Sequence, residues 1–252
     1  MTHLMYAVFR EADRPGRPTG LGPDGAAVAV VPDDDLAAAV SRAPADGLPP
    51  TLPRVKAYTQ VIADLHAVST VLPFRYGCFL GGRDEVQALL ETRREAFQSA
   101  LERVSGCAEM GVRLLLPEQE AKAAPTPPPA QDRSSGKAYL LSRRRHYDRM
   151  DRGEERAHAA LERLRETFAD DCVAFAEEET GGGVRGLASA SFLVRRTEVD
   201  RFRATFKRYQ AAARMPALLS GPWPPYSFAR LEPERPAEPK ADCGARSIAE
   251  SP

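Results

Sequence analysis

The chain has 252 residues, which suits two domains of roughly 100 residues each. It carries 35 lysines and arginines against 35 aspartates and glutamates, and this zero net charge argues against binding to nucleic acid or membranes through bulk charge. No run reaches the ~18 apolar residues of a membrane span, the N-terminus has no basic leader, and the four cysteines form no CxxC pair. We therefore expect a cytoplasmic protein with reduced thiols and no zinc site.

The segment from residue 1 to residue 118 alternates between strand patterns and helix patterns. Both alternating faces of Met1–Arg10 are apolar, which is typical of a central strand buried on both sides. The elements that follow are predicted as a hairpin of Ala26–Val31 and Leu36–Ser41, a helix over Arg54–Val71, a strand over Phe74–Leu80, a helix over Arg83–Val104 and a strand over Cys107–Leu116. This alternation predicts a ferredoxin-like α+β sandwich for residues 1–118.

Residues 119–135 contain four prolines, and we expect a semi-rigid linker there. Residues 136–231 predict a second α+β domain, with strands over Cys172–Ala176 and Val184–Arg195. Apolar residues at three-four spacing before residue 169 and within Thr197–Arg214 predict a long antiparallel helical pair. Residues 232–252 are rich in Pro, Glu and Ala and have almost nothing to bury, and this composition predicts a disordered tail.

The residues that could carry catalysis form no known constellation. The four histidines (His3, His66, His146 and His158) lie outside any HExxH or His-Cys pattern, and no GxSxG motif is present. The glycine-rich run at 181–186 lacks both the Walker lysine and the Rossmann spacing. We therefore predict a protein that is not an enzyme, with no catalytic residue, no cofactor and no metal site.

The segment RYGCFL at Arg75–Leu80 is similar to the strand with which RNA-recognition domains stack bases on aromatic rings. The glycine that should follow its first basic residue is missing. Residues 1–118 carry 12 basic and 15 acidic side chains, a net charge of −3, so they lack the positive surface that RNA binding needs. The alternative is that Tyr76 and Phe79 pack in a core and that Arg75 forms a structural hydrogen-bonding fork.

The most unusual segment is GPWPPYSF at Gly221–Phe228. It holds the only tryptophan of the chain, three prolines and two further aromatic residues. Prolines restrict the backbone, so the aromatic side chains are held in place at low entropic cost. The segment is either a rigid plug that closes a core or a preformed surface for protein recognition.

These residues carry a family resemblance. ALLSGPWPPYSF at Ala217–Phe228 resembles the C-terminal signature of the gas vesicle protein F/L family (GvpF/GvpL), and VLPFRYGCFLGGRDEVQALL at Val71–Leu90 resembles its LPxRFG segment. Cys107–Val112, with Glu109 and Gly111, resembles its E-x-G-V strand, although Met110 stands where the family often has an aromatic residue. GKAYL at Gly136–Leu140 is similar to the segment with which the family enters its second domain. His66 lies where the family has a histidine, in the helix before the LPxRFG segment.

The resemblance implies a non-catalytic accessory protein for the assembly of gas vesicles. Its partners would be the small hydrophobic major shell protein and other gas vesicle accessory proteins, with no nucleic acid and no membrane. It would be cytoplasmic, associated with gas vesicles, and would help to nucleate or extend the shell. The alternative is an undetected enzyme or RNA-binding module on a ferredoxin-like scaffold.

We expect the site residues in two groups. In the N-terminal segment, Tyr6, Arg75 and Tyr76, with Gly77, are expected to face the shell protein. In the signature, Trp223 is expected to be buried as a plug. The signature residues are Gly221, Pro222, Trp223, Pro224, Pro225, Tyr226 and Phe228.

Overall fold

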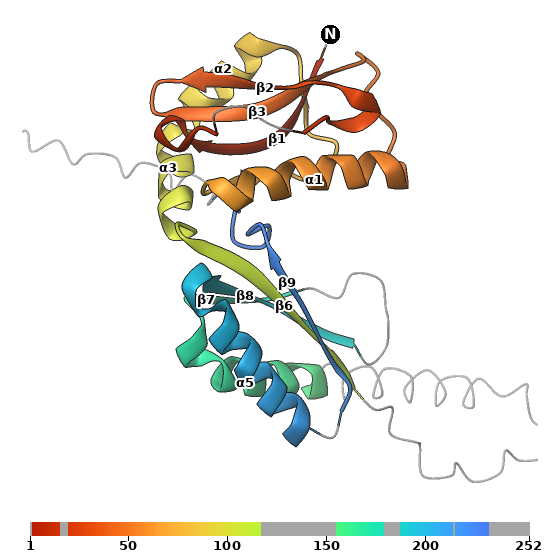
Figure 1. Cartoon of the computed structure of the whole chain (residues 1–252), viewed down its shortest axis with the longest axis vertical. Coiled ribbons are helices and arrows are strands. Elements are labelled where there is room, and N and C mark those ends of the chain that lie inside the picture. Colours follow the sequence, from red (N-terminus) through yellow and green to blue (C-terminus); the bar gives the residue numbers. More distant parts are fainter. Residues whose placement is uncertain (1, 16–19, 117–154, 179–186, 214, 232–252) are drawn as a thin grey trace, which may run out of the picture.

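The computed structural model describes residues 2–15, 20–116, 155–178, 187–213 and 215–231. Two antiparallel sheets organise these residues, one in each half of the molecule (Figure 1). The first has the strand order β2-β3-β1-β4, with β5 also paired to β1, and the second has the order β7-β8-β6-β9. With helices packed on both sheets, the predicted α+β class is confirmed. None of the described helices is long and apolar enough to cross a membrane.

The first sheet is built around the strand predicted at the N-terminus. Its strands are β1 (Thr2–Arg10), β2 (Val28–Asp33), β3 (Leu36–Ala43), β4 (Leu72–Pro73) and β5 (Phe79–Leu80). Helix α1 (Leu52–Val68) covers one face, while α2 (Arg83–Thr92) and α3 (Arg94–Arg103) lie on the other (Figure 1). This double cover buries residues 4–9 of β1 completely, which explains why both faces of the strand are apolar.

Two predicted elements of this half are interrupted. The expected strand Phe74–Leu80 is reduced to β5, because Gly77 takes a left-handed φ of 99° in the turn between β4 and β5. The expected helix Arg83–Val104 is divided at Arg93, whose φ and ψ of −108° and 18° leave the helical region. The predicted hairpin is present as β2 and β3, in antiparallel register.

The last strand expected in the N-terminal sandwich belongs to the other sheet. Strand β6 (Cys107–Leu115) pairs with β8 (Leu187–Arg195) along its whole length, and also with β9 (Ala217–Trp223); β7 (Ala174–Glu177) is the outer neighbour of β8. Together with a helix over residues 155–167 and α5 (Val199–Ala212), these strands follow a β-α-β-β-α-β order.

The ferredoxin-like arrangement expected for residues 1–118 is therefore found in the second half instead. In the first half, β1, β2 and β3 follow one another without an intervening α-helix.

The helix over residues 155–167 and α5 cover one face of the second sheet (Figure 1). Leu164 and Phe202 are fully buried in the shared core, and the rings of Phe168 and Phe202 stack with centroids 4.6 Å apart. The first part of the predicted long helix, the linker at 119–135 and the tail at 232–252 lie outside the described residues.

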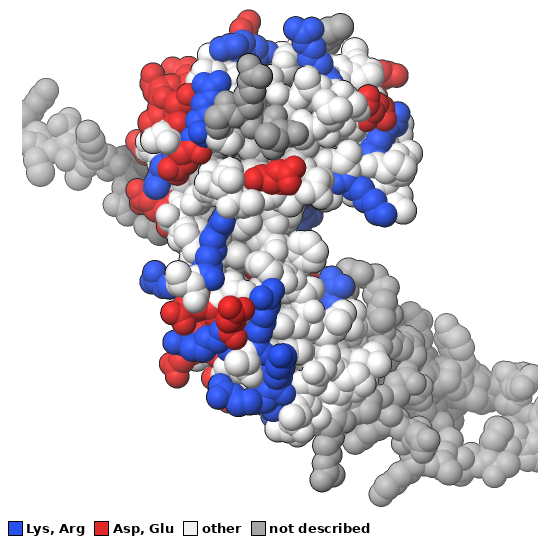
Figure 2. Space-filling model, viewed as in Figure 1, with Lys and Arg blue, Asp and Glu red and all other residues white. Residues whose placement is uncertain are grey.

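The two halves share part of one apolar core. Leu193 of β8, Cys107 of β6 and Phe228 pack into the same cluster as Leu101 and Val104 at the end of α3. Figure 2 shows charged side chains of both signs over the upper and lower halves and a mostly uncharged waist between them. Whether residues 1–118 and 136–231 fold as separate domains stays a prediction.

Candidate functional site

The signature segment lies at the junction of the two halves. After β9 ends at Trp223, the chain loops upward and reaches the first half beneath α1 (Figure 1). Pro224, Pro225 and Phe228 are buried, and Tyr226 is half-buried. Tyr226 packs against the core between α1 and the first sheet, while Phe228 enters the core shared by both halves. The segment therefore fills the junction with its second half.

The tryptophan has the opposite orientation to the expected one. Its side chain is 53% exposed, so the prediction that Trp223 is the buried plug is wrong. In the sheet register, Trp223 stands opposite Glu109 at the end of β9. The chain then bends through Pro224 and Pro225, which turns Tyr226 toward the first half and leaves Trp223 in solvent.

Strands β9 and β6 approach each other so closely at position 221 that only glycine fits there. The φ of Gly221 is 106°, in the left-handed region that disfavours other residues. A Cβ at this position would lie 2.6 Å from the backbone oxygen of Glu109 and 3.1 Å from Sδ of Met110. Any other residue would push β9 away from β6 and displace the aromatic residues that follow.

A buried carboxylate anchors the signature to the second sheet. Glu109 is only 7% exposed, and its Oε2 accepts a hydrogen bond from the backbone N–H of Ser227 at 2.8 Å. Its Oε1 accepts from Oγ of Ser227 at 2.8 Å and lies 2.9 Å from Oγ of Ser191, on β8, a hydroxyl that also lies 2.8 Å from Oε1 of Glu178. The network joins β6, β8 and the signature, so the position of Trp223 depends on residues far apart in the sequence.

The N-terminal tyrosines form a buried stack rather than a surface. Tyr6 is fully buried, and its hydroxyl lies 2.8 Å from Oγ of Ser41. The Tyr58 hydroxyl donates to the carbonyl oxygen of Met5 at 2.8 Å, and its ring lies 4.9 Å from that of Tyr6 and 5.2 Å from that of Tyr76. Burial raises the pKa of both Tyr6 and Tyr58. The expectation that Tyr6 faces a partner is therefore wrong.

The other expected N-terminal residues lie nearer the surface. Arg75 and Gly77 are exposed, and Tyr76 is half-buried with its hydroxyl donating to the carbonyl oxygen of Leu48 at 3.2 Å. Among the four N-terminal residues expected to face the shell protein, Arg75 is thus the one that presents a charged side chain at the surface.

An arginine that the sequence reading missed joins the two halves. Arg196 follows β8, and its Nη2 donates to the backbone oxygen of His66 and, at 3.2 Å, to that of Ser69, at the end of α1. The same nitrogen lies 2.9 Å from Nδ1 of His66. Burial, reinforced by the adjacent guanidinium, lowers the pKa of His66 to about 4, so this imidazole is neutral near pH 7. His66 is therefore a structural acceptor at a helix C-terminus.

An open groove of about 370 Å³ runs along the junction. Its walls are Leu72 and Pro73 of β4, Phe74 and Arg75 just after it, Phe97 from α3, Tyr226 of the signature, and Ala229–Leu231 after the signature. The groove thus brings together Arg75 and Tyr226, two predicted site residues that are 151 positions apart in the sequence. It also includes Arg230, which no local sequence pattern indicated as a site residue.

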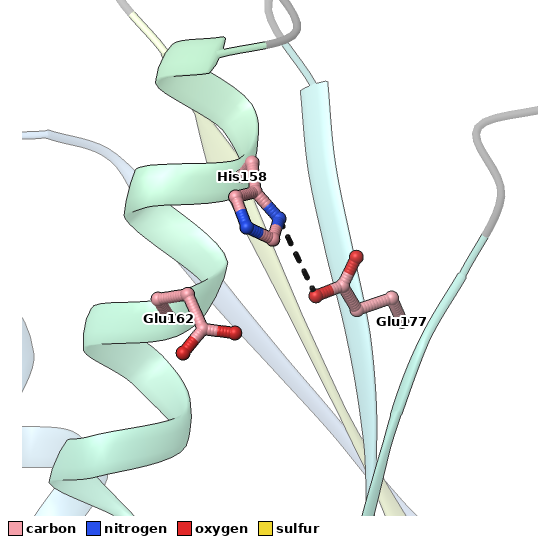
Figure 3. A group of neighbouring side chains, drawn as sticks. All are labelled: His158, Glu162 and Glu177. Atoms are coloured by element: carbon pink, nitrogen blue, oxygen red, sulfur yellow. Dashed lines mark ion pairs between the residues drawn. The ribbon is translucent and has the colours of Figure 1, made fainter.

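One cluster on the second half has ligand-type side chains. His158 and Glu162 on the helix over 155–167 and Glu177 on β7 point toward one another (Figure 3), with candidate ligand atoms within 4.8 Å. Nδ1 of His158 lies 3.9 Å from Oε1 of Glu177, and Arg165 pairs with Glu162 at 3.6 Å. All three side chains are at least 41% exposed, and we read the cluster as solvated ion pairs.

The chemistry of these groups favours binding over catalysis. The two serine hydroxyls of the junction contact the carboxylates of Glu109 and Glu178 and each other, with no histidine beside them in the described residues. Burial raises the pKa of the thiols of Cys78, Cys107 and Cys172, which makes them poor nucleophiles. What the site offers is an exposed tryptophan, a groove and the network that positions both.

Comparisons with known proteins agree on one family. The model of the family described as "Gas vesicle synthesis protein GvpL/GvpF" matches residues 2–230. The chain is 32% identical to gas vesicle protein L of Streptomyces sp. (strain CB03234), over 87% of this chain and 86% of that protein. It is 30% identical to gas vesicle protein F of the same strain, over 90% and 99% respectively.

Two solved structures share the fold. The crystal structure of GvpF from Microcystis aeruginosa has a TM-score of 0.71 at 16% identity and covers 91% of this chain and 99% of its own. That of GvpF from Anabaena sp. PCC7120 has a TM-score of 0.70 at 15% identity, with coverages of 92% and 97%.

Proposed function

This chain belongs to the GvpL/GvpF family of gas vesicle synthesis proteins, and we propose that it acts there as a non-catalytic assembly factor that binds the major shell protein. Binding would help to nucleate or extend the vesicle shell. Its place would be the cytoplasm, at the growing vesicle, where it would also meet other gas vesicle accessory proteins. A hydrophobic shell protein has to be kept from aggregating before it assembles, and a partner that displays apolar side chains suits that task.

The observation that carries the proposal is the outward display of Trp223. Alternation along β6 and the register with β9 place Trp223, Leu218 and Leu115 on the sheet face opposite the helices. The three side chains are 53%, 60% and 51% exposed. Large exposed apolar side chains on a rigid support are typical of protein interfaces, and tryptophan is enriched among the residues that dominate binding energy.

The rigidity of the support strengthens the proposal. Gly221 fixes the approach of β9 to β6, two buried prolines follow Trp223, and Glu109 holds Ser227 by two hydrogen bonds. A backbone held in this way loses little conformational entropy when a partner binds.

A pull-down with the purified major shell protein tests the proposal. Trp223→Ala should weaken shell-protein binding by about tenfold or more, the effect expected for a dominant interface residue. Its melting temperature should stay close to that of the wild type, because the side chain is mostly in solvent. Val68→Ala, at an exposed apolar position on α1, is the control and should bind normally. Failure of the wild-type protein to capture the shell protein, or unchanged capture by Trp223→Ala, would overturn the proposal.

A further inference from the structure

The junction groove combines an apolar wall with two arginines. The half-buried side chains of Phe74, Tyr226 and Leu231 supply aromatic and aliphatic surface, while Arg75 and Arg230 line the groove with exposed side chains. The two arginines come from different halves of the molecule, so the groove exists only where the halves are packed together.

Neither arginine is used by the fold. Within the described ranges, the guanidinium groups of Arg75 and Arg230 make no hydrogen bond and no ion pair. Other arginines contrast with them: Arg94 pairs with the aspartates of the β2–β3 turn, Arg196 caps α1, and Arg103 donates to the carbonyl oxygen of Arg230 at 3.0 Å. Arg75 and Arg230 therefore present positive charge and unused hydrogen-bond donors beside an apolar surface.

Hydrogen bonds hold the walls of the groove in place. The N–H of Phe74 donates to the carbonyl oxygen of Tyr6 at 2.8 Å, and the Tyr58 hydroxyl lies 2.9 Å from the carbonyl oxygen of Phe74. On the other wall, the N–H of Phe228 donates to the carbonyl oxygen of Pro225 at 3.2 Å. The groove is preformed, which lowers the entropic cost of filling it.

We propose that this groove binds a short segment of the shell protein that carries an aliphatic side chain next to a carboxylate. The aliphatic group packs on Phe74 and Tyr226, and the carboxylate pairs with the guanidinium groups of Arg75 and Arg230, whose planar shape matches that of a carboxylate. A volume of about 370 Å³ has room for a few side chains and not for a whole helix. The identity of the partner rests on the proposed function, whereas the chemistry of the segment follows from the groove.

Overlapping peptides of the major shell protein, titrated against the full-length chain by fluorescence anisotropy, test this inference. A peptide that contains Asp or Glu beside aliphatic residues should bind, and its amide version should bind more weakly. Replacing Arg75 and Arg230 together by glutamine should weaken binding by about tenfold. Arg83→Gln, at an exposed arginine outside the groove, is the matched control and should change binding by less than about twofold.

A charge reversal makes the test specific. Arg75→Glu should reject the acidic peptide and accept the version in which its carboxylate residue is replaced by lysine. Capture of the full-length shell protein without any dependence on Arg75 or Arg230 would overturn the groove while leaving the proposed function intact. Failure of the wild-type chain to capture the shell protein at all would instead count against the proposed function. The chain's own tail, with Glu232 and Glu234 just after Leu231, is the competing occupant. If replacing both glutamates by glutamine raises the affinity of every acidic peptide, the tail fills the groove and the inference is wrong.

Discussion

Replacing Glu109 by alanine should loosen the signature from the second sheet. The buried carboxylate accepts hydrogen bonds from the N–H and hydroxyl of Ser227, both at 2.8 Å, and lies 2.9 Å from the hydroxyl of Ser191. Alanine removes both acceptor oxygens and their three contacts, and it leaves a half-buried backbone N–H without a partner. The segment that carries Trp223 would then be held mainly by the packing of Phe228 and Tyr226.

The size of the effect follows from these contacts. A hydrogen bond to a charged group contributes about 1.5–3 kcal/mol net to stability. The cost of burying a carboxylate that is only 7% exposed offsets part of this gain. The hydroxyls of Ser227 and Ser191 also lie 3.2 Å apart and can bond to each other in the variant. We therefore expect a loss of about 2–4 kcal/mol, or roughly 5–15 °C in melting temperature for a protein of this size.

Thermal and urea unfolding of purified variants measure this loss. Glu109→Gln keeps one acceptor oxygen and should lose about half as much stability as Glu109→Ala. Glu102→Ala is the control, because that side chain is 74% exposed and its nearest partner, Arg10, is 3.9 Å away. A loss below about 0.5 kcal/mol for Glu109→Ala would refute the reasoning, since it would mean that the network does not hold the signature.

Three further predictions concern the core and the junction. Leu164→Ala should cost about 2–5 kcal/mol in the free energy of unfolding, because the side chain is fully buried, whereas Leu115→Ala at a half-exposed position should cost far less; urea denaturation compares the two. Arg196→Ala should cost about 1–3 kcal/mol, because it leaves carbonyl oxygens at the end of α1 without their donor, and Arg195→Ala should cost little; equal losses would contradict the assignment. His66 has a folded pKa of about 4, below its unfolded value, so its neutral form stabilises the fold above about pH 6.5 and stability falls as the pH drops from there toward 4. Unfolding at pH 7 and pH 4.5 should show a smaller drop for His66→Gln than for the wild type, and equal drops would contradict the predicted shift.

Local sequence patterns predicted much of the secondary structure. The apolar faces of Met1–Arg10, the paired runs that form β2 and β3, and the three-four spacing of α1 reflect which side chains each element must bury. Such patterns depend on neighbours within a few residues, so they can be read from the chain alone. The octamer at Gly221–Phe228 could be singled out in the same way, because its composition is unusual and its prolines restrict the backbone.

The interruptions at Arg93 and Gly77 show the limit of that reading. Both residues lie within runs of periodic apolar residues, and the spacing of those residues does not predict where the strand or the helix is interrupted. Gly77 can take its φ of 99° because it lacks a side chain, yet the turn it makes is set by where β4 and β5 pair with β1.

The amino-acid sequence by itself determined the α+β class, the central buried strand and the segment most worth testing, because each depends on composition or short-range periodicity. Only the tertiary structure decided that Cys107–Leu115 joins the second sheet, that Trp223 faces solvent while Tyr226 faces inward, and that Arg75 meets Arg230 in one groove. The reason is distance along the chain. Glu109 and Ser227 are 118 residues apart, and Arg196 and His66 are 130 apart. Contacts of this range depend on how whole elements pack, and no local pattern encodes them.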